Sequence, residues 1–385
     1  MDHFSSWLSK QKQAGQFRSL TPVIRANDGR VNLAETGKAL LDFSSNDYLA
    51  LSLHPRVIEE SHRYLDLAGS GAGAARLMSG DLELYHELEE KIARLKGREA
   101  ALLFGSGYMA NSGIIPALAG RHDAIFSDRL NHASIHDGCR LAGAKVHRFR
   151  HNDLNHLEEL LHRHRGSGQA LIVVESIYSM DGDFCPLREL AALKEQYDCL
   201  LMVDEAHATG LYGSNGSGLI EEEGITDQVD IAMGTFGKAL GSYGAYIAAS
   251  RDMVEYLINR ARSFIYSTAL PPAVIGASSA AVDIIQTEPK LRRELHGKAL
   301  LFKEILKKGG VDHPGPSQII PVLVGDSDRA VAMAARLRKE GIFATAVRPP
   351  TVPPGTARLR FSITLHLSDD DILRCGRLLL RTLGL

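Results

Sequence analysis

Short apolar runs alternate with amphipathic stretches through the middle of the chain. The apolar runs predict β-strands at 100–104, 123–128, 170–176, 199–206 and 229–236. Between them, segments such as 154–164 and 187–197 place leucines at helical spacing. Strands that alternate with helices favour right-handed crossovers, and therefore a mostly parallel sheet in an α/β fold.

Polar residues close three of these predicted strands. Glu175, Asp204 and Thr235 each lie at the carboxyl end of an apolar run. In open parallel sheets, ligands bind beyond the carboxyl ends of the strands. We therefore expect a binding site at this edge of the predicted sheet.

The pattern differs on either side of this region. The segment 23–33 predicts a hairpin that turns at Asp28-Gly29, and 82–96 predicts an amphipathic helix. After residue 271 the sequence predicts a smaller α+β domain, with helices at 273–308 and 328–340 and strand-like segments at 317–325, 342–350 and 357–365. The predicted organisation is an N-terminal segment (1–45), a large cofactor-binding domain (46–270) and a small C-terminal domain (271–385).

Charge and cysteine content exclude several classes of function. The chain of 385 residues has 44 Lys and Arg against 46 Asp and Glu, a net charge of −2. Such a chain has no broad field to hold nucleic acid or an anionic membrane. The four cysteines form no CxxC pair, no apolar stretch is long enough to span a membrane, and the first residues lack the apolar run of a signal peptide. We expect a cytoplasmic protein.

A histidine-rich segment raises the question of a metal. Histidines occur at 147, 151, 156, 162 and 164. The spacing matches no zinc motif such as HExxH, and the charged helical pattern around the last three favours a solvated helix face. We predict no metal site.

Four features together indicate a pyridoxal phosphate site. Asp204 ends an apolar strand, Lys238 follows 34 residues later among small residues, Gly105-Ser106-Gly107-Tyr108 opens a helix, and His132 lies between them in the sequence. Such an enzyme needs a Schiff-base lysine, a carboxylate at the pyridine nitrogen, a helix N-terminus for the phosphate and a flat group over the ring. The turn also matches the GxGxxA pattern of nicotinamide-dependent dehydrogenases. That alternative leaves Lys238 and Asp204 unexplained.

The motifs along the chain resemble those of the α-oxoamine synthases, a family of fold-type I pyridoxal phosphate transferases. The resemblance runs from LDFSSNDYLALS to RPPTVPPGTARLRFS, and passes through GSGAGAARLMSG, FGSGYMAN, SDRLNHASIHDG, ESIYSMDGD, MVDEAHATG, TFGKALGSYGA and FIYSTALPP. It implies a mostly parallel central sheet in a large domain, a smaller α+β domain, bound pyridoxal 5'-phosphate and a homodimer. One departure is Ala245, where relatives often have glycine.

The resemblance also implies roles for individual residues at the cofactor. Lys238 would be both the Schiff-base lysine and the base, and Asp204 would pair with the pyridine nitrogen. His132 would stack on the ring and contact the substrate. The remaining cofactor contacts implied are Ser179 and His207 at the phenolic oxygen, and Gly107, Tyr108 and Thr235 at the phosphate, with Thr268 contributed by a neighbouring subunit.

Four further residues are implied at the substrates. Arg360 would bind the amino-acid carboxylate with help from Asn46. Arg18 would meet the distal carboxylate of the acyl chain, with Thr351 in the same region.

Glu175 would support His132 or the cofactor through hydrogen bonds, or else be a solvated strand end.

Within the family, the chain most resembles the member that acts in biotin biosynthesis. The implied reaction is decarboxylative condensation of L-alanine with a pimeloyl thioester, carried on coenzyme A or on acyl-carrier protein. The alternatives are sister enzymes that use another amino acid or acyl donor, namely 5-aminolevulinate synthase, serine palmitoyltransferase and 2-amino-3-ketobutyrate ligase. A catalytically dead scaffold subunit is a further alternative, which the joint presence of Lys238, Asp204 and His132 disfavours.

Overall fold

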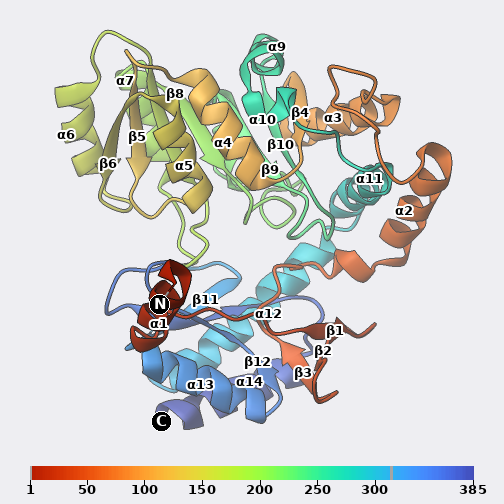
Figure 1. Ribbon diagram of the computed structural model, residues 1–385, viewed down its shortest axis with the longest axis vertical. Helices are drawn as coiled ribbons and strands as arrows, with labels where there is room; N and C mark the ends of the chain where they lie inside the picture. The colour runs from red at the N-terminus through yellow and green to blue at the C-terminus, as the bar shows by residue number, and fades with distance from the viewer. Residues whose placement is uncertain (1, 313–314) are drawn as a thin grey trace. The chain divides into compact units, whose positions relative to one another are not determined.

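The computed structural model describes residues 2–312 and 315–385, and it divides into two compact units (Figure 1). The first unit comprises 1–50, 180–183 and 293–385, and the second comprises 51–179 and 184–292. The predicted domain boundaries at 45/46 and 270/271 stay predictions. Each unit has its own sheet or sheets and is described separately.

A seven-stranded sheet forms the centre of the second unit. Its order is β4-β10-β9-β8-β7-β5-β6. All neighbouring pairs from β9 to β6 are parallel, whereas β10 is antiparallel to both β4 and β9. The strands are β4 (Ala100–Phe104), β5 (Ala124–Asp128), β6 (Lys145–Phe149), β7 (Ala170–Glu175), β8 (Leu200–Asp204), β9 (Ile231–Thr235) and β10 (Ala245–Ala249).

The apolar runs explain why this sheet lies in the core. Every residue of β7 is buried, as expected for a central parallel strand with both faces covered. The register pairs Glu175 with Asp204 and Asp204 with Met233. The polar residues that close β7, β8 and β9 therefore lie at one edge of the sheet.

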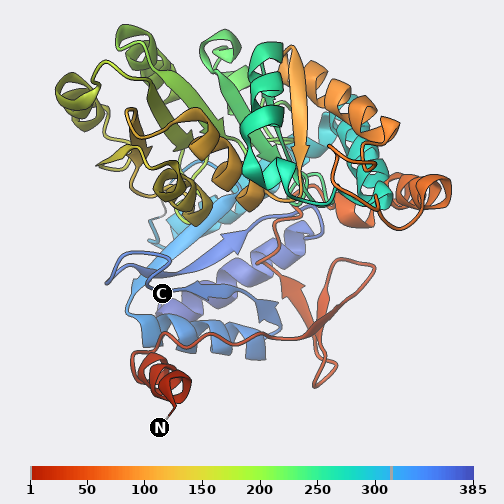
Figure 2. The same cartoon turned by 45° about the horizontal axis from the view of Figure 1, so that its top comes forward.

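Helices pack on this sheet and beside its ends. In Figure 1, α4 and α5 cross in front of the strands, and α4 contacts α5, β9 and β10. Figure 2 shows α3 and α11 next to the β4 end of the sheet, and α6 at the β6 end. The helices of this unit are α2 (Pro55–Ala68), α3 (Glu83–Lys96), α4 (Gly107–Leu118), α5 (Ala133–Ala142), α6 (Leu154–His164), α7 (Leu187–Gln196), α8 (Leu219–Glu222), α9 (Arg251–Arg260), α10 (Arg262–Ile265) and α11 (Pro272–Thr287), with short 3-10 turns at Leu51–Leu53 and Thr226–Gln228.

The first unit contains two small sheets. One has the order β1-β2-β3-β12 and the other β11-β14-β13, and α13 packs on strands of both. An aromatic cluster of Phe43, Phe302 and Phe361 lies in its core, with ring centroids 5.3–6.0 Å apart. The elements are α1 (His3–Gln13), β1 (Val23–Arg25), β2 (Val31–Leu33), β3 (Ala39–Asp42), β11 (Ile319–Gly325), α13 (Ser327–Lys339), β12 (Ile342–Phe343), β13 (Thr345–Val347), β14 (Ala357–Ser362) and α14 (Asp369–Leu383), while α12 (Lys290–Lys308) begins in the second unit and continues in the first.

The structure confirms most predicted elements and corrects one. The hairpin is present, with β1 antiparallel to β2 around Asp28-Gly29. The continuous helix predicted over 273–308 is wrong, because α11 ends at Thr287 and α12 begins at Lys290. Pro289 lies in the break, where it lacks an N–H and disfavours helical backbone at the residue before it.

Hydropathy along the helices is also informative. Among the residues that the structure describes, no helix combines the length and the apolar character that crossing a membrane requires.

Candidate active site

Asp204 lies at the centre of the candidate site, at the end of β8. Its side chain is buried. Oδ1 accepts a hydrogen bond from the N–H of Ala206 at 2.9 Å, and Oδ2 accepts one from Nδ2 of Asn111, also at 2.9 Å. These two donors are neutral, so they orient the carboxylate without neutralising its charge. Asp204 is therefore suited to bind a protonated ring nitrogen.

Lys238 lies on the loop between β9 and β10, at the same edge of the sheet, and is half-buried. Its charge acts on the pKa of both His132 and Glu175. The second unit thus brings the predicted lysine, the predicted carboxylate and the predicted ring-stacking histidine into one electrostatic neighbourhood.

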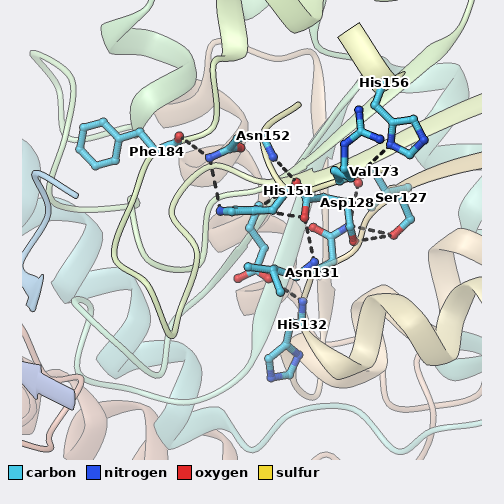
Figure 3. A network of polar contacts seen from close by, with 12 residues as sticks. Ser127, Asp128, Asn131, His132, His151, Asn152, His156, Val173 and Phe184 are labelled. Atoms are coloured by element: carbon cyan, nitrogen blue, oxygen red, sulfur yellow. Dashed lines mark hydrogen bonds and ion pairs between the residues drawn. The ribbon is translucent and has the colours of Figure 1, made fainter. Parts of the chain in front are cut away.

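His132 is the N-cap of α5, and its ring points away from the polar cluster around Asp128 and His151 (Figure 3). Its Nδ1 lies 3.2 Å from the N–H of Ser134 and 2.8 Å from Oγ of the same serine. Although His132 keeps solvent access, partial burial lowers its pKa, and the positive charge of Lys238 lowers it further against the opposing charge of Asp204. The lowered pKa favours the neutral form of the ring.

Glu175 supports His132 from the end of β7. It is buried, and one carboxylate oxygen accepts the backbone N–H of His132. Burial, together with the neighbouring charge of Asp204, raises the pKa of Glu175 well above its usual range. Glu175 therefore favours its protonated form, and the interpretation as a solvated strand end is wrong.

The N-terminus of α4 and the end of β9 form a cradle that fits a phosphate. Ser106 caps α4 by accepting the N–H of Met109 at 3.2 Å, which leaves the N–H groups of Gly107 and Tyr108 at the open end of the helix. A Cβ at Gly107 would lie 2.8 Å from Cγ2 of Thr235, so only glycine fits there. The buried hydroxyl oxygen of Thr235 has no hydrogen-bond partner among the described residues. An unsatisfied hydroxyl beside a helix N-terminus is what an absent phosphate would leave.

Three other predicted cofactor residues also belong to the second unit. His207 is buried three residues after Asp204, and Ser179 is half-buried before the segment 180–183. Thr268 is exposed after α10 and forms an isolated bridge with Ala75. Their predicted contacts with the cofactor and with a second subunit stay predictions.

Arg360 and Asn46 lie together in the first unit. Arg360 is buried on β14, where it donates to Oγ of Ser362 at 2.7 Å and to Oδ1 of Asn46 at 3.2 Å. Asn46 also accepts from the hydroxyl of Tyr48 at 3.1 Å. The guanidinium and the amide that were predicted to share a carboxylate are therefore in direct contact.

The second predicted substrate pair is also formed within the first unit. Arg18 donates to the hydroxyl of Thr351 at 2.9 Å, and both side chains are exposed. They line a cavity of about 730 Å³ whose other walls include Leu20, Ala334 and Val347. Arg338 and Arg348 also line it, and none of its lining residues is acidic. An apolar chain with an anionic end suits such a cavity.

Asn111 and Ser134 are site residues that the sequence reasoning did not single out. Both are buried, and the amide nitrogen of Asn111 donates to Oγ of Ser134 at 3.0 Å as well as to Asp204. A signal existed in the sequence, because Asn111 lies on the first turns of the helix that opens with the glycine-rich segment. Its direction toward Asp204 depends on how α4 packs against the sheet, which the sequence alone does not give.

Two histidines of the histidine-rich segment stack on each other. The rings of His147 and His164 lie face to face with centroids 4.3 Å apart, and Phe126 stacks on His147 at 5.3 Å. Over residues 2–312 and 315–385, no group of three or more His, Cys, Asp or Glu side chains is placed to hold a metal ion.

Fold and site define the class of protein as a fold-type I pyridoxal phosphate enzyme. Residues 38–374 match the family model described as aminotransferase class I and II. Among solved structures, the serine palmitoyltransferase from S. paucimobilis with a bound PLP–myriocin aldimine is 29% identical, with a TM-score of 0.93 over 99% of this chain and 96% of that one. The 8-amino-7-oxononanoate synthase from Francisella tularensis is 28% identical, with a TM-score of 0.78 over 90% of this chain and 98% of that one.

Comparison with curated relatives identifies the family more specifically. The 8-amino-7-oxononanoate synthase of Geobacter sulfurreducens is 50% identical over 95% of this chain and 94% of its own length. That of Geotalea daltonii is 49% identical over 97% of this chain and 96% of its own length. The chain belongs to the 8-amino-7-oxononanoate synthase family. It is an enzyme of the pyridoxal phosphate-dependent acyltransferases, which confirms the predicted family, fold class and cofactor.

Proposed function

We propose that this chain condenses L-alanine with a pimeloyl thioester, with loss of carbon dioxide and release of the thiol, to give 8-amino-7-oxononanoate for biotin biosynthesis. The observation that carries the proposal is the grouping at the sheet edge of Asp204 with neutral donors, Lys238 within electrostatic range of His132, and the unsatisfied hydroxyl of Thr235. The identity to curated synthases over almost the whole chain supports the choice of reaction.

The cofactor contacts follow from this grouping. Pyridoxal phosphate, when bound, supplies a ring that withdraws electrons from the Cα of an attached amino acid. Lys238 Nζ would hold the cofactor, and Asp204 would keep a proton on its pyridine nitrogen. The N–H groups of Gly107 and Tyr108 and the hydroxyl of Thr235 would hold the phosphate, while Ser179 and His207 would serve the phenolic oxygen.

In this reaction Lys238 transfers the protons, and His132 contacts the substrate. Lys238 Nζ would accept the proton from Cα of alanine. Cα would attack the thioester carbonyl carbon, the C–S bond would break, and the departing thiolate would take a proton from solvent to become the free thiol. The alanine carboxylate leaves as carbon dioxide, and Lys238 returns a proton to Cα. The neutral ring of His132 covers the reacting group and offers a hydrogen bond to the substrate.

The first unit supplies the groups that suit the two substrate carboxylates. We assign Arg360 with Asn46 to the α-carboxylate of alanine, because a guanidinium binds a carboxylate bidentately. We assign Arg18 with Thr351 to the distal end of the pimeloyl chain, beside the apolar walls of their cavity. A charge-assisted bond at that end contributes roughly 1.5–3 kcal/mol, about a tenfold to hundredfold preference for a carboxylate over a methyl end.

We further propose a cytoplasmic homodimer in which Thr268 serves the site of the neighbouring subunit. The exposure of Thr268 on a segment bridged to Ala75 leaves it accessible for such a contact. The four cysteines, all within the described ranges, form no disulfide, which suits a reducing compartment. Inactive Lys238→Ala chains mixed with inactive Thr268→Ala chains would regain partial activity if the sites are composite. No recovery in mixtures that demonstrably exchange subunits would contradict the shared site.

The test of the reaction is a panel of amino acids against thioesters. The purified holoenzyme is given L-alanine, glycine, L-serine or L-threonine with pimeloyl-coenzyme A, pimeloyl-acyl-carrier protein or palmitoyl-coenzyme A. We expect carbon dioxide release and the eight-amino product by mass spectrometry only with alanine and a pimeloyl donor, and no turnover by Lys238→Ala. A larger kcat/KM for serine with palmitoyl-coenzyme A would replace this proposal with a sister reaction.

Donor choice is tested separately. Pimeloyl, its methyl ester and an unsubstituted heptanoyl thioester are compared in wild type and Arg18→Ala. We expect the free acid to lead by about tenfold to hundredfold in wild type and to lose that lead in the variant. Equal kcat/KM for the three donors in wild type would contradict a pocket that recognises the distal carboxylate of the acyl chain.

A further inference from the structure

A chain of hydrogen bonds joins Asp204 to His132 through Asn111 and Ser134. Nδ2 of Asn111 lies 2.9 Å from Oδ2 of Asp204 and 3.0 Å from Oγ of Ser134. Oγ of Ser134 lies 2.8 Å from Nδ1 of His132. Asn111 and Ser134 are each 1% exposed, so the two bonds of the Asn111 amide are buried, whereas the bond to His132 is partly exposed.

The direction of each bond follows from which groups can donate. A carboxylate can only accept, so the group of Asn111 that faces Asp204 is the NH₂ and not the oxygen. Its two hydrogens are then committed, one to Asp204 and one to Oγ of Ser134. Consistent with this orientation, Oδ1 of Asn111 has no partner among the described residues.

The bond from Asn111 also determines which group donates in the hydrogen bond between Ser134 and His132. Because its hydroxyl oxygen accepts the Asn111 hydrogen, its own hydrogen is available to donate to Nδ1 of His132. The backbone N–H of Ser134 also points to Nδ1, at 3.2 Å, and an N–H cannot accept. Two donors converge on Nδ1, which therefore carries no proton, and a neutral ring must carry its proton on Nε2.

We propose that Asn111 and Ser134 are positioning residues that hold His132 as its neutral Nε2–H tautomer and couple that tautomer to the carboxylate of Asp204. The inference rests on the proposed function, in which His132 covers the cofactor and meets the substrate. Nε2 then presents a hydrogen to substrate oxygens, whereas the other tautomer would present a lone pair and repel them. Protonating the ring would set an Nδ1–H against the N–H of Ser134, so the same relay opposes the charged form. This agrees with the lowered pKa of His132, to which burial and Lys238 contribute.

The direct test is nuclear magnetic resonance of the full chain labelled with ¹⁵N-histidine, with and without pyridoxal phosphate. The His132 signals are assigned as those missing from His132→Asn. We expect Nδ1 at the resonance of an unprotonated ring nitrogen and Nε2 at that of a nitrogen bearing hydrogen near pH 7. A hydrogen on Nδ1, or an even mixture of tautomers, would overturn the proposal without any variant.

Variants then test whether these two residues set the tautomer. Asn111→Ala and Ser134→Ala should each lower the Nε2–H to Nδ1–H ratio, by roughly threefold to tenfold, and raise the titration midpoint of His132. The shift is smaller in Asn111→Ala, because both the hydroxyl and the backbone N–H of Ser134 remain beside Nδ1 of His132. The matched control is Asn259→Ala on α9, whose exposed amide bonds the carbonyl of Glu255 in its own helix and should change nothing.

The outcomes separate this inference from the proposed function. A wild-type enzyme that condenses alanine with pimeloyl thioester but shows Nδ1–H would refute the relay alone. Correct tautomers in an enzyme that uses other substrates would refute the proposed reaction alone. Folded variants, checked by circular dichroism, that keep the wild-type tautomer ratio would show that Asn111 and Ser134 do not set it.

Discussion

Asp204 and Glu205 are adjacent carboxylates at the end of β8, and both are buried, yet their partners are of opposite kinds. Glu205 forms an ion pair with Lys96, with Nζ and Oε2 2.7 Å apart and both side chains at most 1% exposed. It also accepts the N–H of Ile220 at 2.9 Å. The bonds to Asp204 come from a backbone N–H and from the amide of Asn111.

The difference separates a structural charge from a functional one. Burial alone would lower the pKa of Lys96, but Glu205 and Tyr246 outweigh it and raise that pKa, so Lys96 keeps its charge beside Glu205. Asp204 is fixed in direction by neutral donors and not by a cationic side chain within hydrogen-bond distance among the described residues. A buried carboxylate held in this way indicates that a cationic ligand group completes the site.

We expect the largest effect, a loss of unfolding free energy, from removing the cation of the Lys96–Glu205 ion pair. Lys96→Met leaves Glu205 buried without its cation, which costs about 3–5 kcal/mol of unfolding free energy. Urea unfolding measures the loss. The control is Arg94→Ala on the same helix, whose pair with Glu90 is exposed and contributes at most about 0.5 kcal/mol. A loss in Lys96→Met no larger than the control would show that the pair is not a structural requirement.

The next effect falls on turnover. Asp204→Asn removes the charge that would hold a proton on the pyridine nitrogen, and we expect kcat to fall by about 100- to 1000-fold, as when one preorganised electrostatic partner is lost. KM for alanine should change less, because Arg360, which we assign to the alanine carboxylate, is unchanged in this variant. The exposed Asp198→Asn serves as control. Near-normal kcat in Asp204→Asn would show that Asp204 is not the residue that holds the proton on the pyridine nitrogen.

The smallest effect concerns Glu175, the third carboxylate of the group. Since its pKa is raised, the folded state keeps a proton that the unfolded chain releases above about pH 4.3. Stability therefore falls as pH rises from that value toward the raised pKa, by at most about 1.4 kcal/mol per pH unit. Glu175→Gln keeps an acceptor for the N–H of His132 and should flatten that slope.

The measurement for Glu175 is the free energy of unfolding from pH 5 to pH 8. Glu255→Gln, at an exposed position on α9, should leave the slope as in wild type. A slope that is the same in wild type and Glu175→Gln would mean that Glu175 is ionised in the folded protein.

How far the sequence predicts this molecule depends on the range of the interactions involved. The runs that became β7, β8 and β9 are continuous and apolar, so their positions and polar ends could be predicted locally. The strands β6 and β10 were not predicted, because KVHRF is largely polar and AYIAA is dominated by small residues. Both depend on their neighbours in the sheet more than on their own composition.

The residues of the candidate site also differ in whether local sequence or a long-range contact reveals them. Lys238, Asp204 and His132 could be named because each lies in a motif of adjacent residues. Asn111 depends on a contact between residues 93 positions apart, and the Lys96–Glu205 pair on one 109 positions apart. Such pairs become visible only when the crossing of helices over the sheet is known.

The antiparallel placement of β10 has a consequence for the speed of the chemistry. The segment 236–244, which carries Lys238, leaves β9 and returns along it, and hydrogen bonds from Phe236 to Gly244 and from Ser242 to Phe236 close it. Gly241, at φ 62°, lies so close to Ser52 that a Cβ would meet its nitrogen at 2.2 Å. The backbone of the lysine therefore has little freedom left to lose when a substrate arrives. In the proposed reaction its amine would act at a high effective molarity that folding has already established, and only the torsions of its own side chain would remain to be set in each turnover.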